Sequence, residues 1–157
     1  MLLEKQTVIL GADHAGFRIK EYIKRLLRRM NYKVQDVGTF SRKRVDYPDY
    51  AEKVSLLVLK DTKRKGILAC GTGIGASIAA NKVPGIRAAL VVDENSARLS
   101  REHNDANILV LGGRPFSESK VRKIIKMWLR SRFKGGIHKK RLRKISKIEE
   151  RNMSISL

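Results

Sequence analysis

The stretch ILACGTGIGASIAA, residues 67–80, joins an apolar run to a glycine-rich turn and then to an alanine-rich segment. This succession predicts a buried strand, a tight turn and a short helix over residues 74–82. Glycines at positions 71, 73 and 75 allow the backbone to turn sharply, and the amide groups at the helix start can converge on negative charge. The unit is therefore a strand–turn–helix with a candidate anion-binding loop.

The same alternation of apolar runs and helical patterns extends in both directions. Strands are expected over residues 7–12, 32–38, 66–70, 85–92 and 107–112, and helices over 14–31, 48–61, 74–82, 93–105, 117–133 and 139–150. Alternating strands and helices predict an α/β fold, a Rossmann-like three-layer αβα sandwich with a five-stranded parallel sheet. Such sheets bind ligands at the carboxyl ends of their strands, so the loops after Ala12, Cys70, Val92 and Gly112 are the leading candidates.

Length and composition favour one domain without disulfides. The 157 residues suit a single domain over residues 1–150, with the basic helix 139–150 included and a short tail over 151–157. One cysteine excludes an internal disulfide framework and fits a reducing compartment. No signal peptide and no apolar run of about 18 residues is found, so we expect a cytoplasmic protein without a membrane partner.

The chain is strongly basic. Lysine and arginine number 35 against 15 aspartate and glutamate residues, a formal net charge of +20. Such a balance fits nucleic-acid binding or attraction to phosphorylated substrates. Aromatic residues make up only 6 % of the chain, whereas nucleic-acid readers often interleave them with basic residues. A solvated basic face is the preferred interpretation, with no specific nucleic acid as partner.

Cys70 has more than one interpretation from the residues alone. A free cysteine packs as a small hydrophobic side chain, so it can be purely structural. Its place against a helix N-terminus instead favours the thiolate, which could remove a proton while nearby amides stabilise the resulting oxyanion. The pattern Gly71-x-Gly73-x-x-Ala76, with Asp93 after the next strand, also fits a dinucleotide-binding fingerprint. A P-loop is excluded, because no Gly-Lys-Ser/Thr follows the turn.

Other polar residues stand at the ends of expected elements. Each, taken singly, also fits a cap or a surface position. One helical turn separates His138 from Arg141, so these two side chains face the same way. These candidates are Asp13 and His14 after the first strand, His103 and Asn104 after the fourth helix, Arg114 after the fifth strand, and His138 with Arg141.

Taken together, several segments resemble the ribose-5-phosphate isomerase B family, which includes galactose-6-phosphate and allose-6-phosphate isomerases. The resemblance covers about residues 7–150 and is carried, in order, by GADHAGF, DYPDYA, CGTGIGASIAANK, GIRAAL, SREHNDANIL and GGIH-x-x-R. It implies interconversion of ribose 5-phosphate and ribulose 5-phosphate through an enediolate, in the pentose phosphate pathway, without a metal or cofactor. The alternatives are another phosphorylated sugar, such as allose 6-phosphate or galactose 6-phosphate, or a nucleotide- or nucleic-acid-binding module.

The resemblance also implies roles for individual residues. Cys70 would be the base, the amides of the following loop would hold the enediolate oxygen, and His103 with Asp13 would help to open the sugar ring. The site would be shared between the subunits of a homodimer or tetramer. The implied catalytic residues are Cys70, His103, Asp13 and Thr72, and the implied substrate-binding residues are Asp13, His14, Tyr47, Gly71, Thr72, Gly73, Ile74, Gly75, Asn104, Arg114, His138 and Arg141.

One position departs from the family pattern. The family usually reads Gly-Gly-Arg-His where this chain reads Gly135-Gly136-Ile137-His138. Loss of a charge-assisted contact to a phosphate costs about 1.5–3 kcal/mol of binding. Either Arg141 and another basic side chain suffice, or the substrate differs from ribose 5-phosphate.

Overall fold

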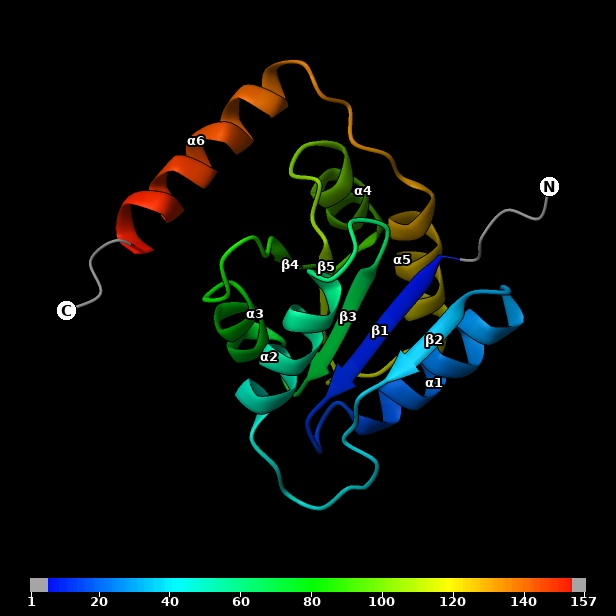
Figure 1. The fold of residues 1–157 in the computed structure, drawn as a ribbon. Helices are drawn as coiled ribbons and strands as arrows, with labels where there is room; N and C mark the ends of the chain where they lie inside the picture. Colours follow the sequence, from blue (N-terminus) through cyan, green and yellow to red (C-terminus); the bar gives the residue numbers. More distant parts are fainter. Residues whose placement is uncertain (1–5, 154–157) are drawn as a thin grey trace.

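The computed structural model describes residues 6–153, and these form the expected parallel sheet with helices on both of its faces. The strands are β1 (Thr7–Ala12), β2 (Lys33–Asp36), β3 (Lys65–Cys70), β4 (Ala88–Leu90) and β5 (Ile108–Gly112). All neighbouring strands pair in parallel, in the order β2-β1-β3-β5-β4 (Figure 1). The central strands β1, β3 and β5 are nearly continuous apolar runs because helices cover them on both sides.

Two helical layers bury the two faces of the sheet. Ile23, Leu109 and Trp128 belong to the core under α1, α4 and α5, whereas Val54 and Val110 belong to the core under α2 and α3. The three-layer αβα sandwich is thereby confirmed. The helices are α1 (Phe17–Arg29), α2 (Tyr47–Val58), α3 (Ile74–Ala80), α4 (Glu94–Glu102), α5 (Glu118–Arg130) and α6 (Ile137–Met153).

Several boundaries differ from the sequence expectation. Strand β4 covers only Ala88–Leu90 of the expected 85–92, because Gly85, at a φ of +84°, still belongs to the preceding turn. Helix α6 covers Ile137–Met153 rather than 139–150, so residues 151–153 are helical instead of part of a tail. The rest of that tail, 154–157, and the first five residues of the expected domain lie outside the described residues.

Backbone segments approach one another very closely at the carboxyl ends of the central strands. A Cβ atom built on Gly16 would fall on the carbonyl group of Ala69, and one on Gly112 would lie 2.8 Å from the carbonyl oxygen of Thr72. The amide of Gly113 donates a 2.6 Å hydrogen bond to the carbonyl oxygen of Cys70. The loops after β1, β3 and β5 are therefore fixed against each other by main-chain contacts.

Helix α6 stands away from the sandwich (Figure 1) and, within the described part of the chain, buries none of its side chains. Its contacts with the rest of the described chain include a 2.9 Å hydrogen bond from the amide of Gly85 to Oε2 of Glu149 and the stacking of His138 on His103. Ile145 and Ile148 are 48 % and 53 % exposed. This amphipathic helix thus leaves apolar surface without cover. None of the helices in residues 6–153 combines the length and hydrophobicity needed to span a bilayer.

Candidate active site

Cys70 ends β3 and lies under the glycine-rich turn. The side chain packs in the α2–α3 core and is 4 % exposed. Its Sγ accepts a hydrogen bond from the amide of Gly73 at 3.1 Å. Gly73 is the residue before α3 and has a φ of +82°, a conformation that glycine adopts without strain. The turn therefore aims an N–H dipole at the sulfur, where it stabilises negative charge.

The rest of the turn presents a mixed surface beside the sulfur. Thr72 is exposed, and its Oγ1 accepts a 3.2 Å hydrogen bond from the amide of Ile74. Gly75 lies directly against the ring of Tyr47 at the start of α2, because any Cβ at Gly75 would clash with that ring. Tyr47, which is 39 % exposed, therefore forms a wall next to the turn that carries Cys70.

The loop after β1 reaches the same edge. The carboxylate of Asp13 is largely buried, and its Oδ1 accepts a 2.9 Å hydrogen bond from the amide of Gly16. The amide of Asp13 itself donates to the carbonyl oxygen of Ala69 at 3.3 Å, next to Cys70. Nδ1 of His14 lies 3.2 Å from both the amide nitrogen and the carbonyl oxygen of Val45.

Together with the exposed Arg114 after β5, these residues form one group at the carboxyl ends of the strands. We call it the carboxyl-edge half-site, and its members are Asp13, His14, Tyr47, Cys70, Gly71, Thr72, Gly73, Ile74, Gly75 and Arg114.

A second group forms where α4 ends. The rings of His103 and His138 stack in parallel, with centroids 4.1 Å apart and planes at 11°. Lys134, in the segment just before His138, contacts the last residue of α4. Its amide donates to the carbonyl oxygen of Glu102 at 3.0 Å, and its Nζ pairs with the Glu102 carboxylate at 2.8 Å. The carbonyl oxygen of Asn104 accepts a 2.9 Å hydrogen bond from Nε of Arg87.

This second group is electropositive. Desolvation lowers the pKa of His138, and the nearby positive charges of His103, Arg141 and Lys134 lower that pKa further. An anion bound among these groups would reverse the electrostatic part of the shift, because it stabilises the protonated imidazole. We call the group the amino-edge half-site, and its members are His103, Asn104, His138 and Arg141.

Within one chain, the two half-sites lie at opposite ends of the parallel strands, one at the carboxyl ends and the other at the amino ends. Helix α4 begins at the carboxyl end of β4 and runs back along the sheet, so its last turn reaches the amino ends of the strands (Figure 1). Cys70 is at the carboxyl end of β3 and His103 is just after α4. A single chain therefore assembles each half-site but does not bring the two together.

The sequence agrees with one known family over most of its length. The model of the family described as ribose/galactose isomerase matches residues 8–145. The chain belongs to this family.

Relatives with known names and structures agree with that assignment. The chain is 44 % identical to ribose-5-phosphate isomerase B of Escherichia coli over 144 residues, which is 92 % of this chain and 97 % of the relative. It superposes on ribose-5-phosphate isomerase B of Clostridium thermocellum with a TM-score of 0.90 and 45 % identity, covering 93 % of this chain and 99 % of that one. The enzyme of Mycoplasma genitalium with bound ribulose 5-phosphate gives a TM-score of 0.88 and 40 % identity, covering 92 % and 96 %.

The structure adds contacts that the sequence did not indicate. Sequence spacing does not relate Val45 to His14, or Lys134 to Glu102, and only the folded loops bring these pairs together. The carboxylate of Asp93, the candidate acid of a dinucleotide fingerprint, accepts a 2.6 Å hydrogen bond from the amide of Ser96 and caps α4. Among residues 6–153, no cluster of three or more His, Cys, Asp or Glu side chains could hold a metal ion.

Proposed function

We propose that this member of the ribose/galactose isomerase family interconverts ribose 5-phosphate and ribulose 5-phosphate, a reaction of the pentose phosphate pathway. The observation that carries the proposal is the Cys70 thiol at the carboxyl end of β3, with the Gly73 amide 3.1 Å from its sulfur. Support also comes from the Escherichia coli and Clostridium thermocellum relatives, which bear the name ribose-5-phosphate isomerase B. The Mycoplasma genitalium relative holds ribulose 5-phosphate itself.

The chemistry follows from the carboxyl-edge half-site. Cys70, as thiolate, removes the proton from C2 of the open-chain aldose, and the electron pair of that bond moves to the carbonyl group to form an enediolate. Transfer of a proton from O2 to O1 and return of the abstracted proton to C1, with the carbonyl group re-forming at C2, then give the ketose. Amides of the turn from Gly71 to Gly75 stabilise the developing oxyanion, and Thr72 supplies a hydroxyl beside them. Removing one such donor typically costs 10²–10³-fold in turnover.

The remaining residues open the sugar ring and hold the phosphate. His103, aided by Asp13, transfers the proton that opens the furanose, and Asn104 hydrogen-bonds the sugar. The phosphate is bound by His14, Arg114, His138 and Arg141. The positive charges that lower the pKa of His138 support this role, because a phosphate dianion is the ligand that such a group favours.

We infer further that the working site is built from two chains, as a homodimer or a tetramer of such dimers. The two half-sites lie at opposite ends of the strands of each sheet. A two-fold arrangement that places the carboxyl-edge half-site of each chain against the amino-edge half-site of its partner would therefore create two complete sites. Ile74 and Ile78 on α3 are 55 % and 58 % exposed, next to the turn that carries Cys70. An interface over this surface would also cover apolar side chains that are otherwise left in water.

A free Cys70 thiol is needed throughout this scheme. A reducing compartment keeps such a thiol free, so we propose a cytoplasmic enzyme.

The activity is tested by direct assay of the purified protein. Ribose 5-phosphate, allose 6-phosphate and galactose 6-phosphate are supplied separately, each with and without EDTA. The expected result is the highest kcat/KM for ribose 5-phosphate, with no effect of EDTA. A higher kcat/KM for a hexose phosphate would move the assignment to that sugar within the family, and no turnover of any of the three would refute the proposed isomerisation.

Mixing defective chains tests the shared site. Cys70→Ala and His103→Ala chains are each inactive alone, and random exchange makes about half of the dimers mixed, each with one intact site. Activity should return to roughly a quarter of the wild-type value by this counting. Mixing two samples of Cys70→Ala is the control and should restore nothing. If no activity returns although exchange is verified by mass spectrometry of tagged chains, both residues must come from the same chain.

A further inference from the structure

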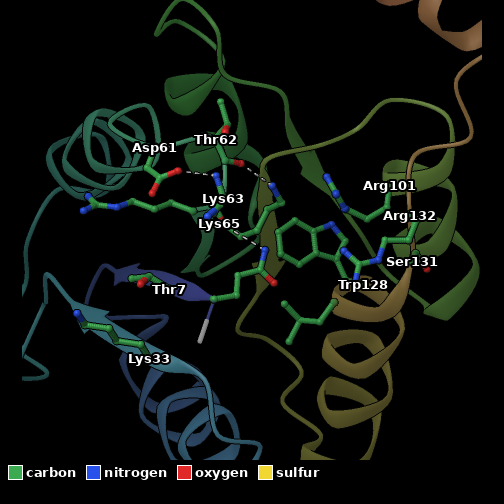
Figure 2. Close-up of a pocket in the computed structure, with 13 residues that line it drawn as sticks. Thr7, Lys33, Asp61, Thr62, Lys63, Lys65, Arg101, Trp128, Ser131 and Arg132 are labelled. Carbon is green, nitrogen blue, oxygen red and sulfur yellow. Dashed lines mark hydrogen bonds between the residues drawn. The ribbon is translucent and has the colours of Figure 1, made fainter. Parts of the chain in front are cut away.

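A cavity of about 530 Å³ opens at the amino ends of β1 and β3, at the edge of the sheet opposite Cys70 (Figure 2). The turn before β3 forms one wall, and the last turn of α5 with the following residues forms the other. Thr7 lies at its floor, and the indole of Trp128 faces it from the α5 side (Figure 2). None of the residues of either half-site lines this cavity.

The lining of the cavity is strongly positive. Among residues 6–153 the one acidic residue of the lining is Asp61, whose Oδ1 accepts a 2.9 Å hydrogen bond from the amide of Lys63, so that oxygen is committed to the turn. The cationic residues come from four separate parts of the chain. They are Lys33, Lys63, Arg64, Lys65, Arg101 and Arg132.

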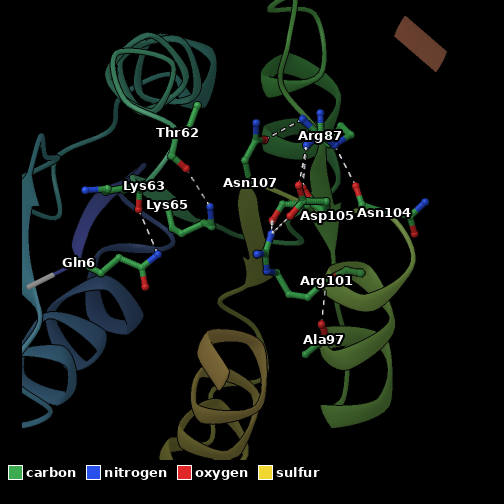
Figure 3. A network of polar contacts seen from close by, with 12 residues as sticks. Gln6, Thr62, Lys63, Lys65, Arg87, Ala97, Arg101, Asn104, Asp105 and Asn107 are labelled. Atoms are coloured by element: carbon green, nitrogen blue, oxygen red, sulfur yellow. Dashed lines mark hydrogen bonds and ion pairs between the residues drawn. The ribbon is translucent and has the colours of Figure 1, made fainter. Parts of the chain in front are cut away.

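One of these cations, Arg101, is held in place by the fold. Arg101 is 8 % exposed, and its Nη1 donates to Oδ1 of Asp105 at 2.8 Å and to the carbonyl oxygen of Ala106 at 2.6 Å. The same Asp105 carboxylate also pairs with Arg87 at 3.5 Å, so one negative charge serves two guanidinium groups (Figure 3). This sharing leaves an excess of positive charge behind the cavity wall.

Lys65 experiences that excess directly. Its Nζ donates only a 3.3 Å hydrogen bond to the carbonyl oxygen of Thr62 among the contacts described for it (Figure 3). Burial lowers the pKa of Lys65, and the positive charges of Arg101, Arg87 and Arg132 lower it further, although the Asp105 carboxylate acts in the opposite direction. The attraction of a bound anion for this ammonium group would offset both the repulsion and the cost of its desolvation.

We propose that this cavity is a binding site for a small phosphorylated anion, separate from the sugar-phosphate site at Cys70. Its volume suits a molecule of a few phosphate groups or a nucleotide, and its cations converge from several elements on one concave space. A duplex backbone instead needs cations spread over a surface that can follow it. Lys33 and Arg132 are exposed at the mouth, and Lys65 and Arg101 lie deeper, an arrangement that matches an anion entering from solvent.

Trp128 makes the site directly measurable, since it is the only tryptophan in the chain and it lines the cavity. Its buried indole N–H has no hydrogen-bond partner in the described residues. Pyrophosphate is titrated into the intact protein at constant ionic strength, and the tryptophan emission is followed. Sodium chloride at matched ionic strength, ATP and a duplex DNA of random sequence are titrated in parallel.

A matched pair of double variants identifies the site. Lys33→Ala with Arg132→Ala removes two exposed cations of the cavity, and Arg122→Ala with Lys126→Ala removes one arginine and one lysine from the exposed face of α5, outside the cavity. We expect saturable emission changes with pyrophosphate or ATP in the wild type and in the α5 variant. The cavity variant should bind about tenfold more weakly, as two partly screened ion pairs are lost. Its isomerase activity should be unchanged.

Three results would overturn the proposal. They are no saturable emission change with pyrophosphate or ATP, an equal loss of affinity in both double variants, and a duplex that binds more tightly at physiological salt than either small anion. The last result would mean that these cationic residues bind nucleic acid instead of a small anion. A lower Kd for ATP than for pyrophosphate would identify the ligand as a nucleotide. A lower Kd for pyrophosphate would identify it as a free polyphosphate.

Discussion

Replacing Gly73 by alanine is expected to reduce stability and turnover together. At a φ of +82°, an L-residue costs about 1–2 kcal/mol relative to glycine. The new Cβ would also lie 2.5 Å from Cδ1 of Leu90, which can move, and 3.1 Å from the backbone nitrogen of Gly112, which cannot move easily. With about 1 kcal/mol for that contact, the loss is about 2–3 kcal/mol, or about 4–12 °C in Tm for a chain of this size.

The effect on turnover follows from the hydrogen bond between the Gly73 amide and the Cys70 sulfur. Any shift of the turn to relieve the new contact moves this donor and the neighbouring amides of the proposed oxyanion site. We expect kcat to fall at least about tenfold, since full removal of such a donor costs 10²–10³-fold. Thermal unfolding and steady-state kinetics with ribose 5-phosphate measure the two effects.

Gly85→Ala is the matched control. Gly85 has nearly the same φ, +84°, but among the described residues the one atom close to its built Cβ is Cδ2 of Leu59 at 3.1 Å, at the end of a side chain that is 44 % exposed. It should lose about 1–2 kcal/mol through backbone strain and keep its kcat. If both variants lose the same stability and both keep wild-type kcat, the turn around Gly73 does not position the catalytic groups.

Four further outcomes are expected. Cys70→Ser should lower kcat by a few orders of magnitude while the substrate still binds in calorimetry, because a hydroxyl is a far weaker base; near-native turnover would remove Cys70 from that role. Arg141→Ala should act mainly on KM, since it removes a phosphate contact, and an unchanged KM would locate the phosphate elsewhere. Ile137→Arg restores the residue usual in the family and should lower KM by up to roughly tenfold; no change would mean that other cations already suffice. Asp36 is subject to burial, which raises its pKa, but hydrogen bonds from two lysines, Lys20 among them, outweigh this and lower it. Its stabilising contribution is therefore present above the unfolded pKa and lost as pH falls through the folded value, so the urea midpoint of the wild type should drop more steeply than that of Asp36→Asn between about pH 5 and pH 2.

Much of the carboxyl edge could be predicted from the sequence, because its determinants are local. The apolar runs of β1, β3 and β5 indicate buried parallel strands, and Pro48 indicated the start of α2, which begins one residue earlier at Tyr47. Parallel strands have their carboxyl ends on the same side of the sheet, so the rule that ligands bind there groups Asp13, Cys70 and Arg114 from the sequence alone. The structure brings all three of the corresponding loops to that edge.

The amino edge could not be predicted in the same way, because it depends on contacts between distant segments. The stacking of His103 on His138 requires α4, α5 and the two-glycine segment to fold back together. The cationic cavity likewise collects Lys33, Lys65 and Arg132 from three separate elements, and each alone resembles an ordinary solvated charge. The sequence revealed the net charge of +20 but not that part of it converges on one cavity.

The contrast between the two edges has a mechanical consequence. Close main-chain contacts at Gly16 and Gly112 fix the surroundings of Cys70 within one chain, whereas His138 follows two glycines whose built Cβ atoms have no neighbour within 4 Å. Within residues 6–153, the segment that carries His138 is held mainly by the His103 ring, the Lys134–Glu102 pair and the hydrogen bond from Gly85 to Glu149. If the working site spans two chains, the interface must supply the missing rigidity, because a catalytic group misplaced by about 1 Å can cost 10²-fold in rate. Interface residues such as Ile78 would then influence kcat without touching substrate.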